Sequence, residues 1–220
     1  STTFQAPVTP GGPRTVSASG PAVGAVQSTF TVTPLLSLDR PNASPGTSVT
    51  ATGVGFGASE TGITVSFDGN LVASGIAADA QGKWSSPFTV PTAAAGSRTI
   101  RASGSLTPAI SVPVVTLTLG ASLKLERSSG PPGTTLIVSG SGFRARETIT
   151  VTVGDGPAIT DVSANEQGVW TANVTVPPGP GGPIVIQASG AGAQPVEASF
   201  TLTPIVSLSQ PTGSPGSSLT

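Results

Sequence analysis

The sequence predicts an all-β protein made of tandem β-sandwiches of about 85 residues, arranged end to end as a rod. Three observations lead to this fold class. Sequence motifs recur with a period near 85 residues, apolar residues alternate with Ser and Thr in short stretches, and Gly or Pro interrupts every candidate helix. The 220 residues include 29 Gly and 22 Pro, as is typical of many short strands joined by tight turns.

Four anchors mark the repeat. The first is a Ser-Pro-Gly-Thr run at 44–47, which recurs as Pro-Pro-Gly-Thr at 131–134 and as Ser-Pro-Gly-Ser at 214–217. The others are a Gly-Phe pair, a Gly-x-Trp run and an Ala-Ser-Gly run. They end at Phe56 and Phe143, at Trp84 and Trp170, and at Gly104 and Gly190. The last three anchors return after 86 or 87 residues, and the first returns after 87 and then 83 residues. The chain is therefore a repeat protein.

The anchors divide the chain into four segments. Residues 35–120 and 121–204 are complete repeats, residues 1–34 are the C-terminal half of a truncated repeat, and residues 205–220 are the N-terminal start of a further repeat. We therefore expect a longer array, with a native mass well above 21.4 kDa. An incomplete sandwich is completed either by the same polypeptide or by strands that a neighbouring subunit donates. Covalent continuity is favoured, because the two terminal segments together lack a counterpart of the strand at 63–67.

The strands follow in the same order within each repeat. Opening strands contain Leu36 and Leu38, Leu123 and Leu125, and Val206 and Leu208. Strict alternation of apolar residues with Thr or Ser predicts strands at 63–67 and 149–153. After each Trp one face is apolar, as shown by Trp84, Phe88 and Val90, by Trp170, Val174 and Val176, and by Phe4 and Ala6. Closing strands contain Phe30 and Val32, Leu117 and Leu119, and Phe200 and Leu202.

Turns and linkers complete the architecture. Asp68-Gly69 and Asp155-Gly156 predict tight hairpin turns, and residues 79–82 predict another turn. Neighbouring repeats are joined by three residues each time, at 33–35, 120–122 and 203–205. Pro in two of these linkers stiffens them, so we expect a semi-rigid rod.

The composition excludes several classes of function. The chain has no His, Cys, Met or Tyr, so it has no disulfide, no zinc site of Cys and His, no haem ligation by His or Met and no catalytic His. With a net charge of −1, the chain lacks the excess of basic residues that attracts nucleic acid. Its apolar runs are too short to span a membrane. We predict no catalytic residue, no cofactor-binding residue and no metal ligand.

The residues resemble a known family. Residues 44–56, the Asp79-Ala-Gln-Gly-Lys-Trp84 turn, the Phe88-Thr-Val-Pro91 run and residues 96–102 are similar to bacterial immunoglobulin-like repeats. The Gly-x-Gly-Phe stretch at 53–56 is similar to IPT/TIG-type domains. The resemblance implies tandem immunoglobulin-like sandwiches in a cell-surface or extracellular protein.

The function that the resemblance implies is structural. We expect a non-enzymatic filament, stalk or cell-surface spacer whose partners are neighbouring repeats or copies of itself in a fibre, with the cell envelope or glycans as further partners. The alternative is an adhesin or a carbohydrate-binding array with its ligand sites on the loops. Exposure of Trp84 and Trp170 separates the two hypotheses, because sugar-stacking rings must face solvent.

The candidate site residues have structural interpretations. Acids recur in pairs between the repeats, at Asp39 and Glu126, Glu60 and Glu147, and Asp68 and Asp155. An active site is unique whereas these positions repeat, so we interpret them as residues of strand ends and turns. Calcium needs six or more oxygen ligands, which such sparse acids do not supply, and Arg40 and Arg127 follow Asp39 and Glu126 directly.

The two Trp residues alternate with apolar side chains, which places them in the core against Phe56 and Phe143. A Ser nucleophile would need a base to activate it, and no sequence pattern assigns that role to Lys83 or Lys124. Asn42 and Asn173 stand in N-glycosylation sequons, which also arise by chance in a chain rich in Ser and Thr.

Overall fold

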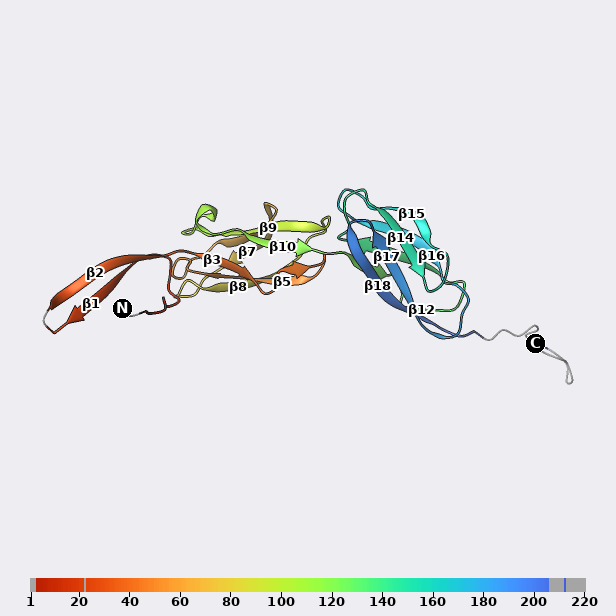
Figure 1. Ribbon diagram of the computed structural model, residues 1–220, viewed down its shortest axis with the longest axis horizontal. Helices are drawn as coiled ribbons and strands as arrows, with labels where there is room; N and C mark the ends of the chain where they lie inside the picture. Colours follow the sequence, from red (N-terminus) through yellow and green to blue (C-terminus); the bar gives the residue numbers. More distant parts are fainter. Residues whose placement is uncertain (1–2, 22, 206–211, 213–220) are drawn as a thin grey trace. The chain divides into compact units, whose positions relative to one another are not determined.

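The computed structural model describes residues 3–21, 23–205 and 212 (Figure 1). The chain divides into two compact units, Ser1–Gly120 and Ala121–Thr220. The predicted strand with Val206 and Leu208, and all of the segment 205–220 except residues 205 and 212, lie outside the described residues. The assignment of four repeat segments stays a prediction.

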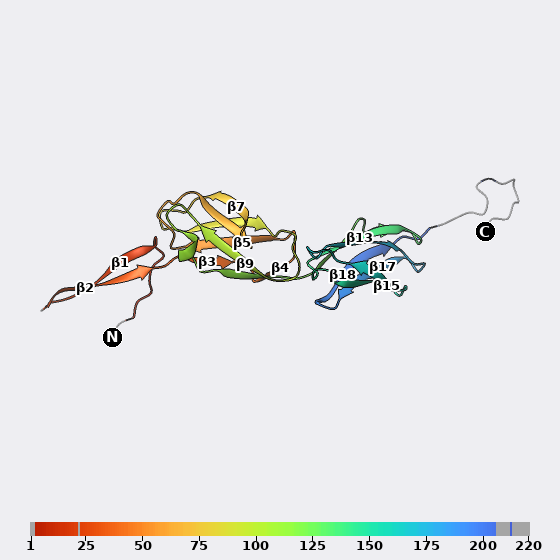
Figure 2. The ribbon, with the colours of Figure 1, turned by 90° about the horizontal axis from the view of Figure 1, so that it is seen from above.

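The first unit contains a β-hairpin followed by a two-sheet sandwich (Figures 1 and 2). Strands β1 (Gly12–Gly20) and β2 (Val23–Val32) form an antiparallel sheet of their own. One sandwich sheet has the order β3-β5-β8, with strands Leu35–Leu38, Ser48–Val54 and Trp84–Thr89. The other has the order β4-β10-β9-β6-β7, with strands Asn42–Ala43, Val115–Leu119, Gly96–Ser103, Ile63–Phe67 and Asn70–Ile76. A short 3-10 helix, η1 (Ala109–Ser111), lies between β9 and β10.

The second unit contains a sandwich with the same strand order. Its first sheet is β11-β13-β16, with strands Ser122–Leu125, Thr135–Ser141 and Trp170–Thr175. Its second sheet is β12-β18-β17-β14-β15, with strands Ser129–Gly130, Ala193–Leu202, Gly182–Gly190, Thr148–Val153 and Ile159–Ser163. Two sheets with this connectivity, antiparallel except for the short parallel pairs β4–β10 and β12–β18, form an immunoglobulin-like sandwich. The predicted fold class, tandem immunoglobulin-like β-sandwiches, is confirmed.

The predicted alternation fills a core in each sandwich. Along β6, Ile63, Val65 and Phe67 are buried while the residues between them are partly exposed, and β14 repeats this pattern. The largest fully buried apolar side chains are Phe56, Ile63, Ile100 and Leu117 in one core, and Leu136, Phe143, Ile149, Ile186, Phe200 and Leu202 in the other. The chain has no Cys, so apolar burial is the main stabilising contribution in each sandwich.

One predicted tight turn is confirmed and the other is wrong. Asp68 (φ 47°) and Gly69 (φ 84°) form the whole loop between β6 and β7, with the positive φ angles that a type I′ turn requires. In the second sandwich residues 154–158 separate β14 from β15. Gly154 (φ 53°) takes the left-handed position there, and Pro157 cannot donate a hydrogen bond to a strand ladder, so the loop is longer than Asp155-Gly156 alone.

The Pro-Gly-Thr anchor forms the same turn in both sandwiches. The N–H and hydroxyl of Thr47 donate to the carbonyl oxygen of Ser44 at 3.1 and 2.6 Å. Gly46 has a φ of 83°, and its N–H donates to Val90 O at 2.9 Å. The turn therefore fastens the start of β5 to the residue that follows β8, and Pro131, Gly133, Thr134 and Val176 repeat these hydrogen bonds.

The prediction that Phe4 and Ala6 continue a strand face is wrong. Residues 3–11 form no strand, and the Phe4 side chain is 68% exposed. The counterpart strands β8 and β16 each pair with a neighbour, β5 or β13. Among the described residues no such neighbour lies beside residues 3–11, so their backbone has no ladder to join.

Candidate functional site

The two Trp residues are core residues, as predicted. Trp84 and Trp170 are each 3% exposed. Trp84 packs edge-on against Phe56 with ring centroids 5.3 Å apart, and Trp170 packs against Phe143 at 5.7 Å. Buried rings offer no platform on which a sugar could stack, so the site predicted for the adhesin alternative is absent at these two positions.

Glycine makes room for each indole ring. Gly53 pairs with Trp84 across the β5–β8 ladder, and Gly140 pairs with Trp170 across the β13–β16 ladder. A Cβ at either glycine would overlap the indole of its partner. This explains why the sequence has a Gly three residues before each Phe of the Gly-Phe anchor.

Glu60 is the most deeply buried acid among the described residues, with 1% of its surface exposed. Its Oε1 accepts hydrogen bonds from the N–H groups of Leu106 (2.6 Å) and Thr107 (2.7 Å). Its Oε2 accepts from the Gly57 N–H (2.7 Å) and from the Thr107 hydroxyl (2.7 Å). The carboxylate therefore ties the turn before β6 to the loop after β9.

The hydrogen bonds decide the protonation state of Glu60. Burial by itself would raise the pKa of this carboxyl group. The hydrogen bonds from Thr107, Gly57 and Leu106 favour the charged form and outweigh burial, so the pKa lies below its ordinary value of 4.5. Glu60 is therefore a charged carboxylate at neutral pH whose acceptor atoms are satisfied by the protein itself.

Glu147 plays the same role in the second sandwich. It accepts hydrogen bonds from the N–H groups of Arg144 (3.0 Å) and Gly192. A Cβ at Gly190 would overlap its carboxyl group, as one at Gly104 would overlap that of Glu60. The Gly of each Ala-Ser-Gly anchor thus leaves space for a buried carboxylate, and this pair of acids is structural.

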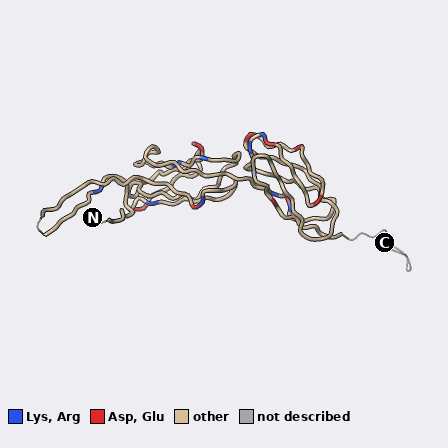
Figure 3. Tube along the Cα trace, viewed as in Figure 1, with Lys and Arg blue, Asp and Glu red and all other residues tan. Residues whose placement is uncertain are grey.

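The remaining acids lie at strand ends and turns. Asp39 accepts a hydrogen bond from Thr50 N–H (2.9 Å) and forms an ion pair with Arg40 at 3.2 Å. The bond from Thr50 and the charge of Arg40 hold the pKa of Asp39 below its ordinary value. Within the described residues no ion pair joins Glu126 to Arg127. Charged side chains are few and scattered (Figure 3), and residues 3–21, 23–205 and 212 contain no cluster of three metal-binding side chains.

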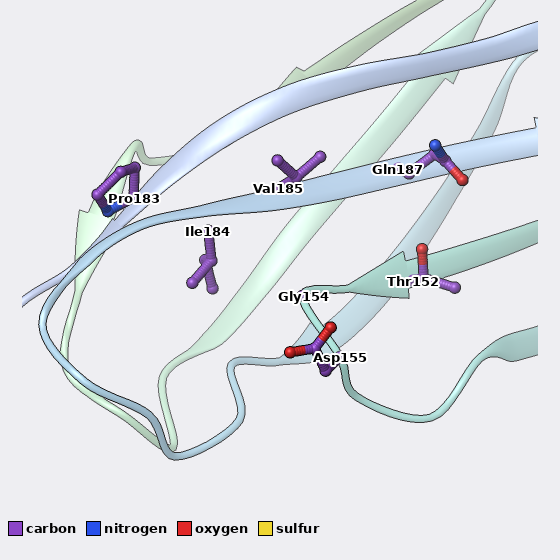
Figure 4. Close-up of a pocket in the computed structure, with 7 residues that line it drawn as sticks. All are labelled: Thr152, Gly154, Asp155, Pro183, Ile184, Val185 and Gln187. Carbon is purple, nitrogen blue, oxygen red and sulfur yellow. The ribbon is translucent and has the colours of Figure 1, made fainter.

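Asp68 and Asp155 occupy different surroundings. The Asp68 carboxylate accepts from Thr99 N–H at 2.8 Å and pairs with Arg98 at 3.4 Å. Asp155 lines a shallow cavity of about 420 Å³ on the second sandwich (Figure 4). The other side chains around it come from β14 and β17: Thr152, Pro183, Ile184, Val185 and Gln187. Asp155 is the one titratable residue of this lining, and none of the lining residues has an aromatic ring.

Lys83, Lys124, Asn42 and Asn173 are all exposed. The Ser139 hydroxyl donates to the backbone carbonyl oxygen of Lys124 at 3.4 Å, and the structure describes no hydrogen bond between a Ser and the side-chain amine of either Lys. No helix in the described part of the chain has the length and apolar character needed to cross a membrane.

A close backbone contact joins the hairpin of the first unit to its sandwich. The Gly11 N–H donates to the carbonyl oxygen of Phe56 at 3.1 Å. A Cβ at Gly11 would overlap the carbonyl oxygen of Gly55, and a Cβ at Gly82 would overlap Phe56 O and lie 3.0 Å from the Cα of Pro10. We call this contact, formed by Pro10, Gly11, Gly55, Phe56 and Gly82, the glycine joint. Sequence reasoning missed it, although its Gly-Phe and Gly-x-Trp anchors were both visible in the repeat.

Gly11→Ala is expected to open the glycine joint. The new Cβ collides with a backbone oxygen, and the Gly11–Phe56 hydrogen bond is lost at a cost of about 1 kcal/mol. Hydrogen exchange should become faster at residues 8–12 and 55–57 while the core of 35–120 keeps its protection. Gly24→Ala is the matched control, because a Cβ there meets nothing within 4 Å. Unchanged exchange in Gly11→Ala would show that this contact does not hold the hairpin.

One family model matches part of the chain. Residues 123–204 match the model of the IPT/TIG domain family. No curated protein sequence matches the chain significantly. Similar solved structures include the Escherichia coli adhesin FdeC, which is 16% identical to this chain with a TM-score of 0.34. The match covers 88% of this chain and 74% of FdeC. The Yersinia pseudotuberculosis adhesin InvE is 12% identical to this chain, with a TM-score of 0.34. The match covers 78% of this chain and 59% of InvE.

A third similar structure is the Bacteroides ovatus protein SGBP-B of a mixed-linkage glucan utilization locus, which is 13% identical to this chain with a TM-score of 0.33. The match covers 88% of this chain and 55% of SGBP-B. The chain spans less than two thirds of InvE and of SGBP-B. The family match falls on the second sandwich, whose strand order, Trp–Gly pair and buried Glu all recur in the first. The chain is therefore composed of immunoglobulin-like repeats, the second of which matches the IPT/TIG domain family over residues 123–204.

Proposed function

We propose that this chain is a non-enzymatic structural protein of the cell surface or extracellular space, in which successive sandwiches form a filament, stalk or spacer. The observation that carries the proposal is the glycine joint. There the hairpin meets the next sandwich backbone to backbone, without intervening side chains. Such a joint limits bending, because rotation that opens the contact breaks the Gly11–Phe56 hydrogen bond, and rotation that closes it compresses the backbone at Gly55.

The mechanism of such a protein is mechanical. Each sandwich is a stiff body with its own core, the joints limit the angles between bodies, and repetition sets the length. A strand of seven residues spans about 23 Å. With its loops, each repeat should advance the rod by roughly 40 Å.

The partners that fit this role are neighbouring repeats and further copies of the chain in a fibre, with the cell envelope or glycans as additional contacts. The low charge and the many Ser and Thr residues favour close lateral packing or a coat of sugar. FdeC and InvE are described as adhesins, and SGBP-B was solved with a mixed-linkage heptasaccharide. These are properties of those proteins, whose likeness to this chain is too low to support the proposal.

Electron microscopy of the native assembly tests the proposal. We expect a thin filament or stalk with an axial repeat of roughly 40 Å per sandwich. A chain that carries Gly11→Ala should show a wider spread of bending angles at the first joint than the unchanged chain. A compact particle without an axial repeat would contradict the structural role.

One observation favours a second candidate, an adhesin with its ligand site on a loop. The first sandwich has a loop at 104–114 between β9 and β10, whereas only residues 191 and 192 separate the corresponding strands β17 and β18. This loop exposes Leu106 and Ile110, the latter by 92%, and Glu60 holds its base. Replacing both residues with Ser should abolish surface binding if the adhesin alternative is correct, and should leave filament formation intact.

A further inference from the structure

The hairpin β1–β2 has the same register as the hairpin β17–β18 of the second sandwich. Gly12 pairs with Val32 as Gly182 pairs with Leu202, and Ala18 pairs with Val26 as Ala188 pairs with Val196. Both hairpins have an irregularity at the same place, between Ala18 and Gly20 and between Ala188 and Gly190. A constant offset of 170 residues therefore relates every position of one hairpin to the other.

In the second sandwich this hairpin is covered on both edges and on one face. Strand β12 pairs with the end of β18, at Thr201 and Leu202. Strand β14 pairs with β17 along its edge, with Val153 opposite Ile186, Val151 opposite Ala188 and Ile149 opposite Gly190. The inward side chains Ile186, Ala188, Phe200 and Leu202 are buried in the core. The covering elements all belong to the first half of the repeat, residues 121–176.

The hairpin β1–β2 has the same apolar side chains without this cover. Phe30, the counterpart of Phe200, is 47% exposed, and Val26, the counterpart of Val196, is 66% exposed. Among the described residues β1 pairs only with β2, so its second edge is free. An apolar hollow of about 260 Å³ lies on the same face, lined by Phe4, Pro7, Val16, Phe30 and Val32 among others.

The part of the free edge that corresponds to the β14 contact carries no residue that discourages pairing. Natural edge strands are protected by Lys, Pro or an inward-pointing charge, yet residues 15–20 of β1 contain neither Pro nor a charged residue. Pro13 and Arg14 stand at the beginning of the strand, outside the stretch that corresponds to the β14 contact. An edge of this kind accepts a further strand by main-chain hydrogen bonds.

We propose that the hairpin β1–β2 is an acceptor site for the first half of an immunoglobulin-like repeat of this same type. A strand like β14 adds to the free edge of β1, with its apolar residues opposite Val16, Ala18 and Gly20. The rest of the half-repeat covers Phe30 and Val26. The proposal concerns how repeats are completed and joined, and it holds whether or not the assembly is a filament.

Two probes test the site on the 220-residue chain. The first is a labelled peptide with the sequence of residues 146–155, which contains β14. The second is the polypeptide 121–176, diluted from denaturant into a solution of the chain. In the control peptide, each apolar residue of 148–153 changes places with the Thr that precedes it. The composition stays the same, but the apolar side chains now point to the opposite face of the strand. Fluorescence anisotropy measures affinity, and hydrogen exchange locates the contact.

A matched pair of variants locates the binding face. Phe30 lies on the inward face of β2, and Thr29 lies next to it on the other face. Phe30→Asp should weaken binding of either probe at least about tenfold, whereas Thr29→Asp should change it less than about twofold. Neither residue belongs to the core of 35–120, so thermal unfolding of that sandwich should be the same in both variants.

The expected result is saturable binding of the half-repeat and of the β14 peptide, with new protection of the amides at 15–20. Three results would overturn the proposal. They are no saturable binding of either probe up to about 1 mM, equal binding of the control peptide, and dimerisation of the chain alone through a contact that Phe30→Asp removes. Electron microscopy of the native assembly tests the filament separately, so failure here is distinguishable from failure of the proposed function.

Discussion

Replacing Trp84 with Ala should lower the free energy of unfolding of the 35–120 sandwich by about 3–5 kcal/mol. The Trp84 side chain is almost fully buried against Phe56 and fills the space that Gly53 leaves open. Its removal therefore forfeits the transfer free energy of the indole and leaves a cavity that rigid strands cannot close. Chemical denaturation followed by circular dichroism measures the change.

The second sandwich provides a control for this variant. Trp170→Ala should produce a loss of similar size in the unfolding transition of 121–204 and leave that of 35–120 nearly unchanged. Leu71→Ala, at an exposed position of β7, should change stability by less than about 0.5 kcal/mol. Parent-like unfolding of Trp84→Ala would contradict the assignment of Trp84 to the core.

Replacing Glu60 with Gln should destabilise the same sandwich by about 3 kcal/mol at neutral pH. The carboxylate accepts four hydrogen bonds, and bonds to a charged acceptor contribute about 1.5–3 kcal/mol each before desolvation is subtracted. In the Gln side chain an NH2 group replaces one of the two carboxylate oxygens. This donor then faces a backbone N–H of Gly57 or of Leu106 and Thr107, with which it cannot form a hydrogen bond. Faster exchange of the Leu106 and Thr107 amides should accompany the loss.

The pH dependence of this effect has a definite sign. The pKa of Glu60 is lowered in the folded state, so the stabilisation by its charge is fully present above the unfolded value of about 4.5. It is lost as the pH falls through the lower, folded pKa. The stability difference between the parent chain and Glu60→Gln should therefore shrink when unfolding is measured at successively lower pH below about 4.5.

Glu166→Gln is the matched control for the charge. Glu166 forms an ion pair with Arg146 at the surface, with both side chains largely exposed, and such pairs contribute about 0–1 kcal/mol. A Glu60→Gln variant as stable as Glu166→Gln, at neutral pH and in acid alike, would refute the structural role of the buried carboxylate.

The sequence alone determined the repeated motifs, the fold class and part of each core, such as Trp84, Phe88 and Val90. The alternating residues of 63–67 and 149–153 were assigned to the correct faces because the side chains of a strand point to opposite sides with a period of two. Trp84 and Trp170 were placed in the core by the same reasoning. Turns were predicted correctly at Asp68-Gly69 and at residues 79–82, where the Gly82 N–H donates to Asp79 O at 3.0 Å, since such geometry depends on local φ preferences.

Other features depend on contacts between residues far apart in the sequence. The repeated acids Glu60 and Glu147 were visible as a pattern, but their role required the position of Thr107 or Gly192, which lie 47 and 45 residues away. The two-residue strands β4 and β12 are too short for periodicity to reveal, and they exist because β10 and β18 offer them a parallel partner.

The glycine joint was decided only by tertiary structure, whereas the incomplete repeat at 1–34 was already expected from the sequence. Gly11, Gly55 and Gly82 each appear in the sequence as ordinary turn residues. Their close approach became evident only when the backbones of residues 10–12 and 55–57 were seen in contact. Phe30 has the same residue type as the buried Phe200, yet its exposure differs because burial depends on which strands lie over a face. A sequence pattern indicates which side chains are apolar, whereas only the assembled sheets determine whether water still reaches them.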